Sequence, residues 1–426
     1  MFSFKVLRNT VIVLRGISGR DAFFSKGLDF MSGYRLLNPQ LVDIMPVSGI
    51  SGEESWATFM ATFIRTEILE RRRSAMIEDI FRTVEGWGDE GSVNMSHQLD
   101  EIVFALSMRI STCREFCEDP RALKMLMHIF ERLEEGSTPS SLILSWIPTF
   151  TRVRRTIAGA QLYAMIDKVV RARKRSNVEE DDALQALILE NYTMVQITRF
   201  VAMMLFASVT NTGNVLCWVL LYLEIHKEWK RRVITEIDAF IRSTGADLAE
   251  TLDEGIAGTP LGVMDEQTPT LDLVISETLR IVLDGTFMRR NIGDDLVVDG
   301  VKIDHGAYLM FPTADLHFEP SLYPDPQEFN PLRFTPEEVE KRNKRGINYV
   351  GWGATRHICI GKRAAVAMMK MVIIILLSKL DTELCDGDGQ RITKIPENKK
   401  DRLFKVCQAK GDILLHYRKR AGQSRA

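Results

Sequence analysis

A thiolate ligand is the first candidate chemistry in this sequence, offered by Cys359 in the segment GWGATRHICIGKRAA. The apolar run after it predicts a helix over 364–380, and a helix N-terminus stabilises a thiolate through its N–H groups and its dipole. Gly353 and Gly361 permit the tight turns and the close approach that a flat cofactor would require. A lone cysteine is more often a small buried apolar residue, so these features alone leave both interpretations open.

A carboxylate and a guanidinium group form the second candidate. Glu277 and Arg280 stand three residues apart in the segment SETLRIV. The apolar residues around them predict a helix over 271–283, so both side chains share one face of it. Taken alone, such a pair is most often an exposed ion pair that adds little stability.

Polar residues gather in the middle of a long uncharged segment that runs from Phe200 to Leu223. Its length would suit a membrane span, which needs about 20 apolar residues. The polar centre argues against lipid, where unsatisfied polar groups are costly, and predicts a buried central helix instead. The polar residues are Ser208, Thr210, Asn211, Thr212 and Asn214.

Mostly helical segments surround these candidates. Alternating apolar residues at the start predict a strand pair joined near Arg8 and Asn9, and short runs after Gly285 predict a small sheet of hairpins. Helical patterns cover 56–118 with glycine-rich breaks, 120–135, 140–146, 150–175, 181–189 and 271–283, and a last strand is predicted over 413–417. The sequence therefore predicts a mainly α chain with small β-sheets.

Composition narrows the function classes. The chain has 426 residues, of which 45% are hydrophobic, and a formal net charge of -2. This balance excludes a generally basic protein that coats nucleic acid, so no nucleic-acid partner is expected. Six cysteines over this length do not make a disulfide framework. No glycine-rich dinucleotide fingerprint follows a predicted strand, so nothing in the sequence indicates that this chain binds a dinucleotide cofactor.

The Cys359 segment resembles the haem-binding signature of cytochrome P450, a family of haem-thiolate monooxygenases. The family pattern runs aromatic, Gly-x-Gly-x-basic-x-Cys-x-Gly, and residues 352–361 match it with two departures. Trp352 stands where Phe is commonest, and Thr355 replaces the second glycine. The resemblance extends over nearly the whole chain and implies the cytochrome P450 fold.

By this resemblance Cys359 is the axial thiolate ligand of heme b. His357 occupies the basic position, as in the sterol 14-demethylase branch, and it or its neighbour Arg356 would face a haem propionate. The segment FMRRNIGDD offers Arg289 and Arg290 for a second propionate contact, and Arg290 is the preferred candidate. The alternative is a solvated basic pair beside the two following aspartates.

The family also pairs its Glu-x-x-Arg helix with an arginine from a later segment rich in proline and aromatic residues. Here Glu277 and Arg280 would be the pair, and Arg333 in FNPLRF would be the third partner. The resemblance implies a buried network that braces the loop carrying Cys359.

In the family, a long helix crosses the distal face of the haem and carries an acid followed by an alcohol. This chain reads ASVTNT over 207–212, so Thr210 replaces the acid and Asn211 the first alcohol. The segment is similar to the branch that holds cholesterol 7α-hydroxylase, sterol 12α-hydroxylase and prostacyclin synthase. Proton delivery is expected to run through water positioned by Thr210, Asn211 and Thr212. The alternative is that these residues only form hydrogen bonds within a kinked helix.

The resemblance implies a monooxygenase, of a fungal secondary-metabolism type, that oxidises an apolar small molecule with O2. The substrate would be a terpenoid, a steroid-like compound or an alkaloid, and NADPH–cytochrome P450 reductase would supply electrons. Residues 71–73, with Lys362 and Arg363, could meet that donor, although a charge run is by default a solvated helix face. Two rivals stay open: a haem-thiolate isomerase that acts on a peroxide, and a truncated relative that is inactive.

One cytochrome P450 domain is expected over 1–426, with 1–50 in a β-rich lobe and 51–426 in an α-rich haem-binding body. The anchor and the first helix of microsomal members are expected to be absent. Membrane association is therefore expected only through a missing N-terminal anchor. For the family, the expected location is the cytosolic face of the endoplasmic reticulum membrane.

Overall fold

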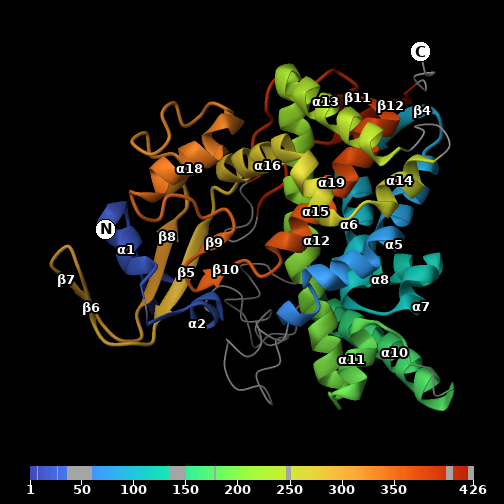
Figure 1. Ribbon diagram of the computed structural model, residues 1–426. Helices are drawn as coiled ribbons and strands as arrows, with labels where there is room; N and C mark the ends of the chain where they lie inside the picture. The colour runs from blue at the N-terminus through green and yellow to red at the C-terminus, as the bar shows by residue number, and fades with distance from the viewer. Residues whose placement is uncertain are drawn as a thin grey trace.

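Two apolar helices form the centre of the helical region (Figure 1). The first, α12 (Met194–Ile225), carries the uncharged segment, and the second, α19 (Lys362–Lys379), follows Cys359. Both are apolar on nearly all sides, as expected of helices surrounded by protein. The computed structural model describes residues 1–6, 8–25, 27–35, 60–134, 150–176, 179–245, 251–399 and 406–420.

The burial of α12 decides between a membrane span and a helix inside the protein. Among the described residues, α12 alone is long and apolar enough to cross a membrane, and 83% of its most apolar window is buried inside the protein. The prediction of a buried central helix is confirmed. Its start is fixed by a capping box between Thr193 and Gln196, and it ends at His226, where α13 (Lys227–Thr244) begins.

The remaining helices pack around these two. α6 (Met95–Ser111) lies along α12, and α5 (Thr66–Glu85) lies against α6 and α19. The others on this side are α7 (Arg114–Glu118), α8 (Pro120–Glu134), α10 (Phe150–Ser176), α11 (Ala183–Leu189), α14 (Leu252–Gly258), α15 (Leu261–Gln267) and α16 (Pro269–Val282). The predicted helices over 120–135, 150–175, 181–189, 271–283 and 364–380 are confirmed within a few residues, and the one over 140–146 lies outside the described residues.

A five-stranded sheet forms the other main part of the fold, seen at the left of Figure 1. Its order is β1-β2-β8-β5-β3, in which only the β2–β8 pair is parallel. The strands are β1 (Phe2–Val6), β2 (Asn9–Val13), β3 (Leu28–Asp29), β5 (Thr286–Asn291) and β8 (Tyr308–Pro312). The predicted N-terminal strand pair and the small sheet after Gly285 are therefore confirmed. The sheet joins the first 29 residues of the chain to a segment in its last third.

Short elements complete the structure. Two hairpins are formed by β6 (Leu296–Val298) with β7 (Val301–Ile303) and by β9 (Gly353–Ala354) with β10 (His357–Ile358). A three-stranded sheet joins β4 (Glu90–Asn94), β11 (Leu380–Asp386) and β12 (Ile413–Lys419). The last helical pieces are α17 (Ala314–His317), η1 (Pro331–Phe334) and α18 (Pro336–Asn343).

Several short elements were not predicted, among them α14, α15, α17, α18, the strands β3, β4, β9, β10 and β11, and two helices near the N-terminus. These two helices are α1 (Gly16–Phe23) and α2 (Phe30–Arg35), and β4 lies at the predicted glycine-rich break after α5. α2 packs so closely on β5 that a Cβ atom at Gly33 would lie 2.5 Å from Cα of Arg289. Such short elements are stabilised by tertiary contacts more than by their own sequence pattern.

Candidate functional site

Cys359 lies in a tight loop between β10 and the start of α19. Its backbone N–H donates a hydrogen bond to the carbonyl oxygen of Trp352 at 2.7 Å. Gly353 has φ +77°, and a Cβ atom there would lie 2.1 Å from the carbonyl oxygen of His357, so only glycine fits. Gly361 is the N-cap of α19. These contacts hold the thiol at a helix N-terminus, as the sequence predicts.

The surroundings of the Cys359 thiol have opposing effects on its pKa. Burial raises the pKa of the Cys359 thiol, whereas hydrogen bonds from the backbone N–H groups of Gly361 and Lys362, and the Lys362 charge, lower it. Of the six cysteines, all within the described residues, only Cys359 has an exposed side chain. The sulfur is therefore surrounded by the loop on one side and open on the other, as a metal ligand must be.

The open side of this loop is apolar. Ile358 and Ile360, on either side of Cys359, have 59% and 40% of their side-chain surface exposed. Isoleucine is usually buried, so this exposure marks a face that a large apolar partner would cover. A haem is a flat macrocycle with a central metal, and it needs a ligand for the metal and an apolar surface for the ring. The thiolate of Cys359 can be the ligand and the two isoleucines provide apolar surface, so the site fits a haem.

The structure also contains a buried ion network. Arg280 donates two hydrogen bonds to Glu277, at 2.7 and 2.8 Å, and neither side chain has exposed surface. Arg333 Nε lies 3.4 Å from the same carboxylate, and the Asn330 N–H donates to it at 2.9 Å. The structure thus brings together the three residues that the resemblance joins. Full burial makes this network costly to break, because each charge would lose its partner in a low dielectric.

Further contacts link the network to the Cys359 loop. Arg280 Nη1 donates a hydrogen bond to the carbonyl oxygen of His317 at 2.7 Å. His317 Nε2 in turn accepts the N–H of Val350, at 3.2 Å, nine residues before the cysteine. Burial, then the Arg280 charge, lowers the pKa of His317 to about 3, so its ring is neutral and can accept this bond.

The two arginines proposed for the propionates lie on opposite faces of β5. Arg289 is 4% exposed, and its guanidinium carbon lies 4.8 Å from the Phe30 ring centre. Burial lowers the pKa of His357, and the positive charge of Arg289 lowers it further. Arg290 instead donates to the carbonyl oxygen of Gly306 at 3.2 Å. The geometry thus places Arg289, not the preferred Arg290, beside His357, because neighbouring residues of a strand point to opposite faces.

The three residues proposed for the distal side of the haem, Thr210, Asn211 and Thr212, have different surroundings on α12. Asn211 is partly exposed, on the same face as Ala207 and Ser208, whereas the residues around this patch are buried. Thr212 is 4% exposed. The Thr210 hydroxyl donates a hydrogen bond to the carboxylate of Glu134, the last residue of α8, at 2.6 Å. Sequence reasoning missed Glu134, since no local motif indicates a contact between two separate helices.

The four arginines suggested for donor docking all have partners within the protein, whereas Lys362 is exposed. Arg71 and Arg72 lie 2.8 and 3.8 Å from Asp181, and Arg363 pairs with Asp265. Arg73 donates to the carbonyl oxygen of Ala257 at 2.8 Å. Surface pairs of this kind contribute little stability, so a partner could replace them.

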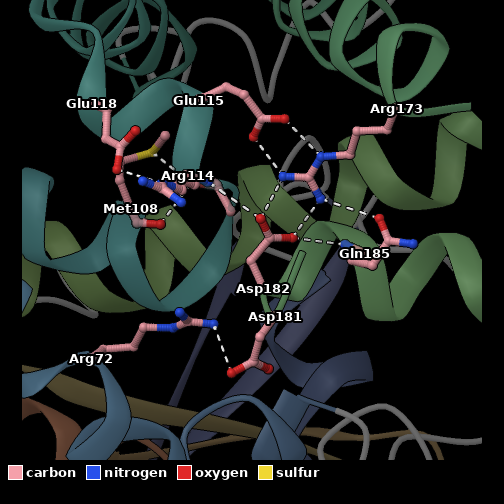
Figure 2. Close-up of polar contacts among 10 residues, drawn as sticks. Arg72, Met108, Arg114, Glu115, Glu118, Arg173, Asp181, Asp182 and Gln185 are labelled. Carbon is pink, nitrogen blue, oxygen red and sulfur yellow. Dashed lines mark hydrogen bonds and ion pairs between the residues drawn. The ribbon is translucent and has the colours of Figure 1, made fainter. Parts of the chain in front are cut away.

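A stronger network lies next to Asp181, as Figure 2 shows. The buried guanidinium of Arg173 donates to Glu115 at 2.7 Å and to Asp182 at 2.8 Å, and thereby ties α10 to α7 and α11. Asp182 also caps α11 by accepting the N–H of Gln185 at 2.9 Å. This cluster binds helices together and lies on different elements from the Cys359 loop.

Comparison with known proteins adds to this geometry. The family model described as "Cytochrome P450" matches residues 54–407. A relative named "Cytochrome P450 monooxygenase dmxR5", from Cryptosporiopsis sp., is 27% identical over 388 residues, 89% of this chain and 76% of the relative. "Sterol 14-demethylase" of Arabidopsis thaliana is 25% identical over 373 residues, 85% of this chain and 72% of the relative.

One solved structure shares the architecture. It is titled "Retinoic acid bound cyanobacterial CYP120A1", and it superposes with a TM-score of 0.77 at 22% identity. The match covers 98% of this chain and 91% of that chain. The mainly α fold with small β-sheets is therefore that of the solved protein.

Proposed function

Because the chain belongs to the cytochrome P450 family, whose members are oxidoreductases that bind heme b, we propose that it is a monooxygenase acting on an apolar small molecule. The balanced reaction is RH + O2 + NADPH + H+ → ROH + H2O + NADP+. The substrate would be a terpenoid, a steroid-like compound or an alkaloid. The plant relative named "Sterol 14-demethylase" supports a polycyclic apolar substrate.

Cys359 is the observation that carries the proposal. Its sulfur accepts N–H groups at the start of α19 and is the one exposed thiol, between two exposed isoleucines. In this proposal Cys359 is the axial ligand, Gly353 and Gly361 shape its loop, and the buried Glu277–Arg280 pair with Arg333 holds the loop in place. The bound haem would supply the binding and reductive activation of O2.

The side chains on β5 and in the loop would hold the propionates. Arg289 and His357 share one region, so a carboxylate between them would accept hydrogen bonds from both and restore the positive form of the imidazole. Arg356, which is exposed, and Arg290 remain candidates for the second carboxylate.

On the distal side, the partly exposed Asn211 and the small residues Ala207 and Ser208 would leave room for O2 and substrate. An amide can orient a water molecule through hydrogen bonds, but it has no acid to give. Thr212 is buried and would contribute through the shape of the helix.

Partner and location follow from the same proposal. A flavin-containing NADPH–cytochrome P450 reductase would deliver electrons at the face that carries Lys362 and Arg363. The protein would act at the cytosolic face of the endoplasmic reticulum membrane. We also propose one domain over 1–426, because β2 near the start pairs with β8 from the last third of the chain.

Turnover with labelled oxygen tests the proposal. The haem-loaded protein would be given NADPH, a reductase, heavy-isotope O2 and a panel of polycyclic probes beginning with testosterone. Incorporation of one heavy oxygen atom per product molecule is expected. If cumene hydroperoxide were instead rearranged without NADPH or reductase, and no labelled product formed, the isomerase alternative would replace the monooxygenase.

A further inference from the structure

The middle of the distal helix has no acid, because the one carboxylate of α12, Glu224, lies in its last turn and pairs with Lys230. From Phe200 to Leu223 the chain contains no Asp, Glu, His, Lys or Arg. With the two electrons of NADPH delivered by a reductase, the reaction at the site is RH + O2 + 2e− + 2H+ → ROH + H2O, so it takes up two protons for each O2. If the proposed function holds, another element must bring an ionisable group to α12, because proton transfer needs a donor within hydrogen-bond reach or one water away.

Glu134 meets this requirement. It is the last residue of α8, and its carboxylate oxygen lies 2.6 Å from the Thr210 hydroxyl, across 76 residues of sequence. Glu134 is half-buried, whereas Thr210 is only 7% exposed. The pair therefore joins a carboxylate with access to solvent to a hydroxyl inside the protein.

Thr210 lies at the edge of the exposed patch of α12. With about 100° per residue, Thr210 is about 60° from Ala207 around the helix axis. A second carboxylate, that of Asp100 on α6, also approaches α12, where a Cβ atom at Gly213 would lie 2.3 Å from its Oδ1. Measured from Asn211, Thr210 lies about 100° and Gly213 about 160° around the axis, so the Glu134 contact is closer to the exposed patch than the Asp100 contact.

We propose that Glu134 is a positioning and proton-relay residue, which acts through Thr210 on water beside the exposed patch of α12. Protonated Glu134 gives its proton to the Thr210 oxygen while the Thr210 hydroxyl proton passes to a water molecule beside this patch. The carboxylate then regains a proton from solvent, so neither side chain changes after a full cycle. The acid that the middle of α12 lacks is thus provided by the C-terminal turn of α8.

Solvent isotope effects on O2 consumption test the relay. The haem-loaded Glu134→Gln variant keeps a side-chain oxygen that can accept the Thr210 hydroxyl, but it cannot carry the proton. With NADPH, a reductase and no organic substrate, we expect O2 consumption to fall about tenfold or more. The ratio of rates in H2O and D2O should rise, and Glu134→Asp should restore part of the rate. Glu131→Gln, one turn earlier on the exposed face of α8, is the matched control.

Unfolding in urea supplies a readout that needs no activity. Glu134→Gln should leave the urea concentration at the unfolding midpoint almost unchanged, because the hydrogen bond with Thr210 persists. A double-mutant cycle of Glu134→Ala and Thr210→Val should be non-additive, as for residues in contact. A Glu134→Gln rate within about twofold of wild type, with an unchanged isotope effect, would overturn the relay. Absence of O2 consumption in the wild type would instead count against the proposed function.

Discussion

Thr355 holds a backbone conformation that suits glycine. Its φ is +53°, in the left-handed region that β-branched residues avoid, and it stands where the family pattern has its second glycine. Its hydroxyl reaches the carbonyl oxygen of Phe24 only at 3.4 Å, a weak compensation. The loop that carries Cys359 therefore keeps its shape at a local cost in stability.

Replacing Thr355 by glycine should stabilise the protein. Relief of the strained φ contributes about 1 kcal/mol, reduced by the greater freedom of glycine in the unfolded chain. The free energy of unfolding in urea measures this effect. Thr335→Gly, at a threonine whose φ is −61°, is the control and should show no gain. A loss of stability in Thr355→Gly equal to that of the control would refute the strain.

Removing Arg280 should have the opposite effect. Arg280→Met leaves the Glu277 carboxylate buried without its main partner, which typically costs about 3–5 kcal/mol. Arg114→Met breaks a pair with Glu118 in which at least half of each side chain is exposed, and should cost much less stability. Urea unfolding of both variants measures the difference. Equal losses in the two variants would mean that the buried network does not hold the fold.

At the scale of elements, predictability follows the length and apolarity of each segment. α12 and α19 could be predicted because their apolar runs are long, and the Cys359 loop because its motif is local. α2 and β4 could not, since packing on other elements stabilises them. Two features of the site could not be predicted from the sequence. The contact of Glu134 with Thr210 joins two separate helices, so no local pattern indicates it. Which face of β5 carries Arg289 depends on the register of the strand, and a shift of one residue would reverse it.

The close packing of α2 on β5 gives a prediction at this scale. Gly33→Ala would place a methyl group 2.5 Å from backbone Cα of Arg289, so α2 must shift, at about 1–3 kcal/mol. Gly159→Ala, inside α10 with nothing within 4 Å of its Cβ position, should instead stabilise by about 0.5–1 kcal/mol. Thermal unfolding of both variants measures this. A gain in both would show that α2 does not press on the sheet.

At the scale of the whole molecule, the pH dependence of stability should report the buried His317. Its pKa is about 3 in the folded protein, against an ordinary value of 6.5. Below pH 6.5 the unfolded chain binds a proton that the folded protein does not bind until about pH 3. Stability should therefore fall in this window as the pH is lowered, by up to about 1.4 kcal/mol per pH unit from this group.

Comparison with a variant isolates that contribution. His317→Gln can still accept the Val350 N–H but does not titrate, so its free energy of unfolding should fall less steeply between pH 6.5 and 3 than that of the wild type. His128→Gln, at an exposed histidine, is the matched control. Parallel wild-type and His317→Gln profiles would contradict the assignment of this slope to His317.

The reduced, CO-bound absorption spectrum of the haem-loaded protein tests the central claim most directly, because its Soret band responds to the axial ligand. With Cys359 as thiolate ligand, the wild type and the control Cys385→Ser should both give the red-shifted band, and Cys359→Ser should lose it. The red-shifted band in Cys359→Ser, or its absence from the haem-loaded wild type, would contradict the assignment of Cys359 as the haem ligand.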